Sequence, residues 1–300
     1  MLMKKIIGLL QNIQNLKISE NVSCKQLTTF KVGGCCTAVF PGTVDAFKSC
    51  LEILKENNIK FIVIGNGSNI VFDDDGYNGI VVVTTELKQF VVSENKICAE
   101  CGAPLYAICT AACNASLSGL QFAYGIPGTV GGAVFMNAGA YDGEIKDCIV
   151  DVTCFDPQTS KLITLTKEEC DFSYRHSAFE DNGLIIIWAN FVLSHGDKDE
   201  IKREMSEIIQ KRRDKQPLNY PSAGSAFKRY PGRYTAKMID DAGLKGFSVG
   251  GAQISEKHAG FIINKDKATC RDIKELVNTV KSVIKDKEGI DIESEIRFIK

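Results

Sequence analysis

Residues 125–141 read Gly125-Ile-Pro-Gly-Thr-Val-Gly-Gly-Ala-Val-Phe-Met-Asn-Ala-Gly-Ala-Tyr141. The recurring glycines cost backbone entropy that ordinary packing does not require, so we expect another molecule to lie against this backbone. The segment contains no lysine or arginine. Its main-chain N–H groups and the amide of Asn137 therefore suit a diphosphate held by backbone donors. A tight turn without a ligand is the alternative.

A second glycine run, Gly65-Asn-Gly-Ser-Asn69, lies between apolar runs at residues 61–64 and 70–72. The pattern predicts a strand, a polar turn and a second short strand. A nucleotide P-loop would need Gly-Lys-Ser/Thr after the glycines, and a Rossmann fingerprint would need a third glycine and a helix. Position 70 is Ile, so both motifs are absent. An anion-binding turn for a second part of the same dinucleotide remains, and the alternative is a turn that closes an ordinary hairpin.

The two glycine runs resemble those of the FAD-binding domain of the vanillyl-alcohol oxidase and p-cresol methylhydroxylase (PCMH) superfamily. Within it, the chain is similar to the UDP-N-acetylenolpyruvoylglucosamine reductase family, through strings that recur in order along nearly its whole length. Besides residues 64–69 and 125–141, these strings are Thr-Thr-Phe-Lys-Val-Gly-Gly at 28–34, Ser-Tyr-Arg at 173–175, Ala-Gly-Ser-Ala-Phe-Lys-Arg at 223–229 and Glu-Ile-Arg-Phe at 295–298.

This resemblance implies an α+β fold: a two-lobed FAD-binding PCMH-type region followed by an α+β substrate-binding domain. We expect the FAD-binding region at residues 1–196, with a small α/β lobe at about 18–92 and a mainly antiparallel β lobe at about 93–196. The substrate-binding reductase domain then occupies residues 197–300. A chain of 300 residues also exceeds what one hydrophobic core usually organises. Without an obvious insertion between Ser225 and Glu295, the chain looks like the compact second type of this reductase.

Local signals predict several elements. We expect a helix at 44–56 capped by Thr43, an amphipathic helix through 201–213 that ends before Pro217, and a helix capped by Thr269 with Asp272 as its capping-box partner. Further elements are an N-terminal helix, a helix at 234–242 ended by Gly243, a strand at 259–264, and an alternating strand at 290–298 that places Glu293, Glu295 and Arg297 on one face.

The resemblance implies a cytoplasmic NADPH-dependent flavoenzyme that reduces UDP-N-acetylglucosamine enolpyruvate to UDP-N-acetylmuramate for peptidoglycan. Hydride would pass from NADPH to FAD and then to the vinyl carbon. The three histidines, His176, His195 and His258, all lie beyond the first lobe. Superfamily oxidases often attach FAD through an N-terminal-lobe histidine, so we expect non-covalent FAD. The predicted cofactor-binding residues are Gly65, Asn66, Gly67, Ser68, Asn69, Tyr124, Gly125, Pro127, Gly128, Thr129, Gly131, Gly132, Asn137, Ala138 and Gly139.

Three residues are expected to carry the chemistry. Hydride addition to an enolpyruvyl ether leaves negative charge on the α-carbon and carboxylate, which needs stabilisers and a proton donor. By resemblance, Arg175 and Glu295 hold that charge and Ser225 protonates the α-carbon. Glu295 would serve best protonated in a desolvated pocket. The alternatives are a surface arginine after a strand, a solvated charge ladder and a serine in an ordinary turn.

Cations near these residues are expected to bind the substrate. Lys215 and Arg229 match binding positions of the family, and Lys228, Arg297 and His258 are further candidates. As ordinary surface groups they would need no such role, and His258 could equally be a hydrogen-bonded loop histidine. Tyr230 stands where the family commonly has proline, and Asp142 where it commonly has glycine, which puts local loop geometry in doubt rather than activity.

Composition limits the possible partners and compartment. The net charge of -1 with interspersed acids and bases argues against nucleic-acid or membrane-surface binding. We expect a cytoplasmic protein, because the twelve cysteines, including adjacent Cys35 and Cys36, fit a reducing compartment. A monomer is expected separately, and no sequence feature tests it. The spacing Cys98-x-x-Cys101 and Cys109-x-x-x-Cys113 superficially suggests a metal site, but the first pair falls on a predicted strand and the second on a helix, so we expect none.

Two other functions remain open. One is an oxidase of the same superfamily that uses molecular oxygen on a small alcohol. The other is a flavin or UDP-sugar binding protein without catalysis, against which the presence of Arg175, Ser225 and Glu295 argues.

Overall fold

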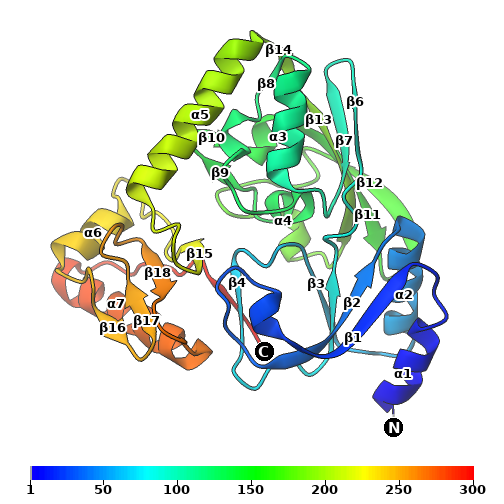
Figure 1. The fold of residues 1–300 in the computed structure, drawn as a ribbon, viewed down its shortest axis with the longest axis horizontal. Coiled ribbons are helices and arrows are strands. Elements are labelled where there is room, and N and C mark those ends of the chain that lie inside the picture. The colour runs from blue at the N-terminus through cyan, green and yellow to red at the C-terminus, as the bar shows by residue number, and fades with distance from the viewer. Residues whose placement is uncertain (1) are drawn as a thin grey trace. The chain divides into compact units, whose positions relative to one another are not determined.

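The computed structural model describes residues 2–300 and divides into two compact units (Figure 1). Unit 1 comprises the described residues through Glu20 together with Ala38–Asn66 and Gly79–Gln210. Unit 2 comprises Asn21–Thr37, Gly67–Asn78 and Lys211–Lys300. Two segments that precede residue 196 in the sequence thus belong to the same compact unit as the C-terminal residues.

The N-terminal part of unit 1 is an α/β layer. Its sheet has the order β1-β2-β5-β3, and β3 pairs in parallel with β5. Helix α2 begins at Thr43, whose side chain accepts a hydrogen bond from the Ala46 N–H as predicted. The elements are α1 (Leu2–Leu10), β1 (Leu16–Ser23), β2 (Cys35–Pro41), α2 (Val44–Glu56), β3 (Phe61–Ile64) and β5 (Ile80–Val83).

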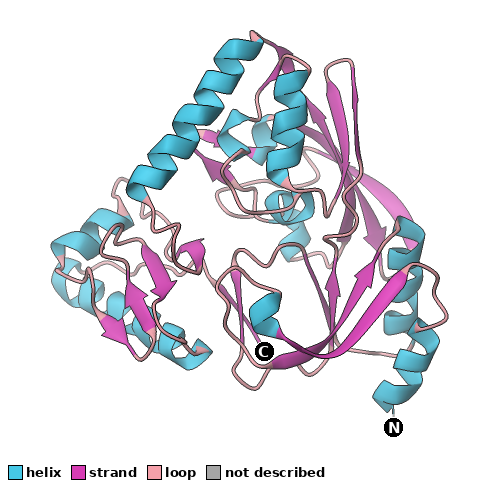
Figure 2. Ribbon diagram, in the orientation of Figure 1, coloured by secondary structure: helices cyan, strands magenta, loops and turns pink. Residues whose placement is uncertain are grey.

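The rest of unit 1 is built on a five-stranded antiparallel sheet of order β12-β11-β13-β7-β6 (Figure 2). Helix α4, which lies in the glycine-rich segment, packs against β13 and β7. The elements are β6 (Phe90–Ser93), β7 (Lys96–Glu100), α3 (Leu105–Asn114), β8 (Leu117–Ser118), α4 (Val130–Phe135), β9 (Gly139–Ala140), β10 (Gly143–Glu144), β11 (Ile149–Asp156), β12 (Lys161–Thr166), β13 (Ile185–Val192), β14 (Ser194–His195) and α5 (Lys198–Lys215). The last residues of α5, from Lys211, belong to unit 2.

Unit 2 contains a four-stranded antiparallel sheet of order β15-β18-β17-β16, against which α7 packs. A separate parallel pair joins β4 to β19. Helix α7 has the predicted capping box between Thr269 and Asp272, and Asp74 adds bonds from the Cys270 N–H (2.8 Å) and the Arg271 N–H (3.0 Å). The elements are β4 (Ile70–Phe72), β15 (Ser222–Ser225), α6 (Thr235–Asp241), β16 (Ser248–Val249), β17 (Ala252–Ile254), β18 (Phe261–Asn264), α7 (Cys270–Glu288) and β19 (Arg297–Ile299).

The predicted α+β class is confirmed, and the structure answers two local questions. Strands β3 and β4 belong to different sheets, so the glycine turn at 65–69 does not close a hairpin. The expected strand over 290–298 is wrong in extent, because regular pairing begins only at Arg297. Residues 293–295 instead make single bonds to neighbouring segments, such as the Glu295 N–H to Ala226 O (2.9 Å).

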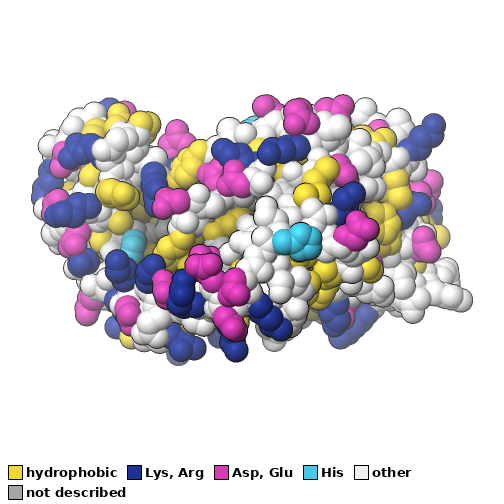
Figure 3. All heavy atoms as spheres, turned by 90° about the horizontal axis from the view of Figure 1, so that it is seen from above, with side chains coloured by type: hydrophobic (Ala, Val, Ile, Leu, Met, Phe, Trp, Pro, Cys, Tyr) yellow, Lys and Arg dark blue, Asp and Glu magenta, His cyan; other side chains and the backbone are white. Residues whose placement is uncertain are grey.

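The surface charge is mixed, and the described helices lack the features of a membrane span. Acidic and basic side chains are interspersed on the face drawn in Figure 3. No helix formed by residues 2–300 combines the length and the apolar character that crossing a bilayer would require.

Candidate active site

The structure brings the start of the first glycine-rich segment, Gly65 and Asn66, against the second glycine-rich segment within unit 1. The Asn66 amide donates to Pro127 O at 2.7 Å. A Cβ added at Gly65 would stand 2.1 Å from Thr129 Oγ1, so only glycine lets this backbone approach the Thr129 side chain so closely. Two stretches that sequence patterns single out separately are therefore neighbours.

Two features at this contact are costly unless something else binds there. Thr129 Oγ1 is buried and has no hydrogen-bond partner among residues 2–300, although buried polar atoms are rarely left unpaired. A Cβ added at Gly132, inside α4, would meet nothing closer than Thr129 Oγ1 at 3.6 Å. Glycine inside a helix costs about 1 kcal/mol relative to alanine. Packing within the protein does not require that glycine, whereas a ligand against α4 would.

Three other glycines of the two segments are needed by the fold itself. A Cβ at Gly131 would lie 2.8 Å from Cys101 Cβ, and one at Gly139 would lie 2.7 Å from Glu144 Cγ. At Gly67 the φ of +59° and an approach of 2.2 Å to Leu27 O both demand glycine. Gly67, Ser68 and Asn69 belong to unit 2, whereas Gly65 and Asn66 belong to unit 1. Tyr124, Gly125, Gly128 and Ala138 lie with the rest of the second segment in unit 1.

The buried side chain of Asn137 holds the glycine-rich segment 125–141 in place. It is fully buried, with Nδ2 donating to Glu144 Oε2 (3.0 Å) and to Ser173 O (2.9 Å), and with Oδ1 accepting from the Lys146 N–H (3.0 Å). Both amide hydrogens are thus used within the chain. These contacts tie the glycine-rich segment to the turn that precedes Arg175.

Arg175 is fixed on the glycine-rich segment by that turn. Ser173 and His176 exchange backbone hydrogen bonds, and Arg175 between them has a φ of +56°, a conformation that is strained for a residue other than glycine. Its Nη2 donates to Gly139 O at 2.9 Å, and its guanidinium stacks on the Tyr174 ring at 4.9 Å. The predicted catalytic cation therefore contacts the predicted cofactor segment.

Ser225 and Glu295, both in unit 2, are adjacent through the backbone. Ser225 is exposed at the end of β15, after Gly224 with its φ of +75°. The next residue, Ala226, accepts the Glu295 N–H at 2.9 Å through its carbonyl, and the Glu295 side chain is half-buried. Two of the three predicted catalytic residues are thus brought together, and Arg175 belongs to the other unit.

The predicted substrate cations are distributed around the Ser225 segment and elsewhere in unit 2. Lys228 pairs with Glu293 at 3.1 Å, and the Arg229 guanidinium lies over the Tyr234 ring at 5.5 Å. Lys215 is exposed at the last residue of α5, and Arg297 begins β19.

His258 is a hydrogen-bonded loop histidine in this structure. Its Nδ1 accepts the Gly260 N–H at 3.1 Å, and its ring packs edge-on against Phe261. Burial lowers the pKa of His258 below its usual value, which favours the neutral ring that this acceptor role requires.

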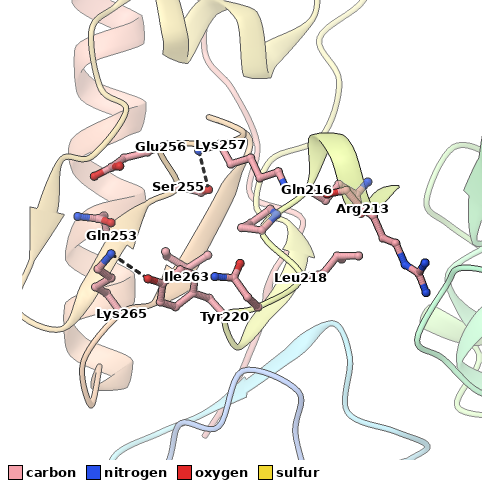
Figure 4. Close-up of a pocket in the computed structure, with 12 residues that line it drawn as sticks. Arg213, Gln216, Leu218, Tyr220, Gln253, Ser255, Glu256, Lys257, Ile263 and Lys265 are labelled. Atoms are coloured by element: carbon pink, nitrogen blue, oxygen red, sulfur yellow. Dashed lines mark hydrogen bonds between the residues drawn. The ribbon is translucent and has the colours of Figure 1, made fainter. Parts of the chain in front are cut away.

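Unit 2 also contains a cavity of about 480 Å³ that no sequence motif signals (Figure 4). The Lys265 ammonium donates to the Tyr220 hydroxyl at 3.0 Å along its wall, and the Lys257 N–H donates to Ser255 Oγ at 3.1 Å. Gln216 Oε1 is buried without a partner among residues 2–300. The lining residues include none of the predicted catalytic or binding residues; they are Arg213, Gln216, Pro217, Leu218, Asn219, Tyr220, Gln253, Ser255, Glu256, Lys257, Ile263 and Lys265.

The cysteines are unpaired, and among residues 2–300 no group of His, Cys, Asp or Glu is arranged to hold a metal ion. Cys35 and Cys98 are exposed, and the other ten are buried. Burial raises the pKa of the Cys101 and Cys148 thiols to about 12, which keeps them protonated at neutral pH.

We therefore expect selective alkylation of the native protein. Because the thiolate is the reactive form, brief iodoacetamide treatment at pH 8 should label Cys35 first and Cys98 more slowly, and should leave Cys101 and Cys148 unmodified until the protein is unfolded. Peptide mass spectrometry measures the order. A Cys35→Ser variant is the matched control, and labelling of Cys101 as fast as that of Cys35 would refute the expectation.

Comparison with known proteins gives consistent matches. Residues 216–299 match the family model described as "UDP-N-acetylenolpyruvoylglucosamine reductase, C-terminal domain", and residues 37–166 match "FAD binding domain". The curated UDP-N-acetylenolpyruvoylglucosamine reductase of Clostridium novyi (strain NT) is 45% identical over 284 residues, covering 94% of this chain and 92% of that protein. That of Clostridium beijerinckii is 46% identical over 283 residues, covering 94% and 91%. The crystal structure of UDP-N-acetylenolpyruvylglucosamine reductase (MurB) from Thermus caldophilus aligns with a TM-score of 0.82 at 32% identity, covering 95% of this chain and 100% of that one.

Proposed function

The chain belongs to the UDP-N-acetylenolpyruvoylglucosamine reductase family, and on this premise we propose how its own residues perform the reaction. It is an FAD-containing oxidoreductase of peptidoglycan precursor synthesis. The proposal is that it reduces UDP-N-acetylglucosamine enolpyruvate to UDP-N-acetylmuramate with NADPH as the reductant. Bound FAD supplies the hydride-transfer chemistry.

The residues of this chain fit that cofactor. The unpaired hydroxyl of Thr129 and the open space beside the Cα of Gly132 suit a polar ligand that lies against α4. We propose that the backbone of residues 125–139, with Tyr124, and the loop 65–69 hold FAD without a covalent bond. Residues 1–196 would then serve the cofactor, and residues 197–300 the sugar nucleotide.

Arg175, Glu295 and Ser225 would act on the substrate. The guanidinium of Arg175 can stabilise the negative charge that develops on the carboxylate, and Glu295 can stabilise the same charge. Ser225, exposed and next to the residue that fixes Glu295, would give its proton to the α-carbon. The single observation that carries the proposal is the bond from Arg175 to Gly139, which joins a catalytic cation to the cofactor segment.

Substrate binding would use the cations of unit 2. Lys215, Lys228, Arg229 and Arg297 are proposed to bind the diphosphate and carboxylate, with His258 as a neutral neighbour. The unpaired thiols support a reducing cytoplasm as the working compartment. We further propose that the protein acts as a monomer.

The reaction is tested by measuring NADPH oxidation with and without UDP-N-acetylglucosamine enolpyruvate. We expect oxidation to depend on the sugar nucleotide and the product to gain two hydrogens, as read by mass spectrometry. An anaerobic repeat separates this reductase from an oxidase, because NADPH would not reduce the flavin of an oxidase that uses small alcohols. A rate of NADPH oxidation that does not depend on the sugar nucleotide would disprove the proposed reaction.

A further inference from the structure

Asn69 in unit 2 makes hydrogen bonds to the two residues that flank Ile296 in the chain. The Asn69 amide donates to Glu295 O at 3.1 Å, and the Arg297 N–H donates to Asn69 O at 3.1 Å. Asn69 lies 226 positions earlier in the chain than Glu295, just before β4. The side chain and the backbone of Asn69 are thus both hydrogen-bonded to the segment that carries the proposed catalytic carboxylate.

The opposite side of this segment is held by the residues that follow Ser225. The Glu295 N–H donates to Ala226 O at 2.9 Å, and the Lys228 N–H donates to Glu293 O at 2.9 Å. No regular strand pairing begins before Arg297, so single bonds of this kind, together with the bond from Ser294 Oγ to Ala226 O (3.3 Å), hold the Glu295 backbone. The Glu295 N–H is satisfied by Ala226 and its carbonyl by Asn69.

The Glu295–Ile296 peptide is hydrogen-bonded on both of its polar sides, because the Ile296 N–H donates to Ser294 Oγ at 3.2 Å while the Glu295 carbonyl accepts from the Asn69 amide. Ile292 and Ile296 are buried and anchor the segment along its length. Removing the Asn69 amide would take away the contact on the carbonyl side and loosen the peptide. A displacement of about 1 Å at a catalytic group can cost a large factor in rate.

From these contacts we infer that Asn69 is a positioning residue for Glu295, in addition to any contact that its loop makes with FAD. The inference rests on the proposed function, because Glu295 matters only if it stabilises charge on the substrate. It assigns the Asn69 side chain to the half-reaction with the sugar nucleotide and not to the half-reaction with NADPH.

The test is a stopped-flow comparison of wild type and Asn69→Ala, both loaded with FAD. Because Asn69 is also among the residues proposed to hold FAD, both half-reactions are measured at saturating FAD. We expect reoxidation by UDP-N-acetylglucosamine enolpyruvate to slow about tenfold more in the variant than reduction by NADPH does, in kcat more than in KM. Asn66→Ala is the matched comparison, because its amide bonds to Pro127 in the cofactor segment and not to Glu295. It should weaken FAD binding instead.

A double-mutant cycle decides whether Asn69 acts through Glu295. In a Glu295→Gln background the Asn69→Ala change should add almost nothing, since residues that act as one unit are not additive. An equal loss in both backgrounds, or reoxidation slowed no more than reduction by NADPH, would each overturn the inference. Asn69→Asp, which keeps the shape and loses the donor, gives the same test should the alanine variant not fold. Wild-type turnover in the same assay tests the proposed function separately.

Discussion

Replacing Ser225 with alanine is expected to slow turnover about a thousand-fold while FAD stays bound, because positioned proton transfer typically contributes a factor of 10²–10⁴. Ser225 is exposed at the end of β15, so its hydroxyl can reach a ligand without rearrangement of the strand. The backbone bond between Ala226 and Glu295 does not involve the Ser225 side chain and should survive the substitution. The loss should therefore lie in the chemistry and not in the fold.

The two half-reactions locate that loss. Stopped-flow absorbance of the flavin should show reduction by NADPH at the wild-type rate and reoxidation by the enolpyruvyl sugar nucleotide slowed about a thousand-fold. Ser222→Ala is the matched control: it makes the same change on the same strand and leaves intact the bond from Thr29 Oγ1 to the Ser222 carbonyl (2.7 Å). A loss of only a few-fold in Ser225→Ala, or an equal loss in Ser222→Ala, would exclude Ser225 as the proton donor.

Local signals in the sequence predict the helices well and the pairing of strands poorly. The caps at Thr43 and Thr269 act within a few residues, so the helices they begin are found where the sequence predicts them. The pairing of β4 with β19 joins residues that are far apart in the chain, and no periodicity within either stretch indicates it. The alternation at 290–298 predicts a strand, but a strand also needs regular pairing along its whole length, and only residues 297–299 have it.

The candidate site shows the same difference between what local sequence predicts and what depends on tertiary structure. The glycine runs mark the backbone at 65–69 and 125–141 as exceptional, since glycine is costly wherever packing does not need it. The roles of Arg175, Ser225 and Glu295 came from family resemblance, because an arginine after a strand or a serine in a turn carries no such information by itself. Contacts such as Arg175 with Gly139, or Asn69 with Glu295, depend on tertiary structure and could not be predicted from local sequence.

Replacing Gly65 with alanine is expected to destabilise the protein and release FAD. The new methyl group would lie 2.1 Å from Thr129 Oγ1 and 3.1 Å from Thr129 Cβ, and Thr129 is buried and β-branched, so it cannot simply swing away. Overpacking of this kind costs about 1–3 kcal/mol, and each 1.4 kcal/mol borne by the bound form weakens FAD affinity about tenfold. Thermal unfolding with and without FAD, and the flavin absorbance kept after gel filtration, measure both effects.

Two further alanine variants distinguish a loss of folding stability from a loss of FAD binding. Gly8→Ala lies in α1 with open space around the new methyl group, so it should keep FAD and leave stability unchanged or raise it by up to about 1 kcal/mol. Gly132→Ala should likewise fold, since only Thr129 Oγ1 at 3.6 Å faces the added carbon, yet it should lose FAD because the methyl group would occupy the space assigned to the ligand. Full retention of FAD by Gly132→Ala would remove α4 from the cofactor site and leave the glycine at that position without an explanation.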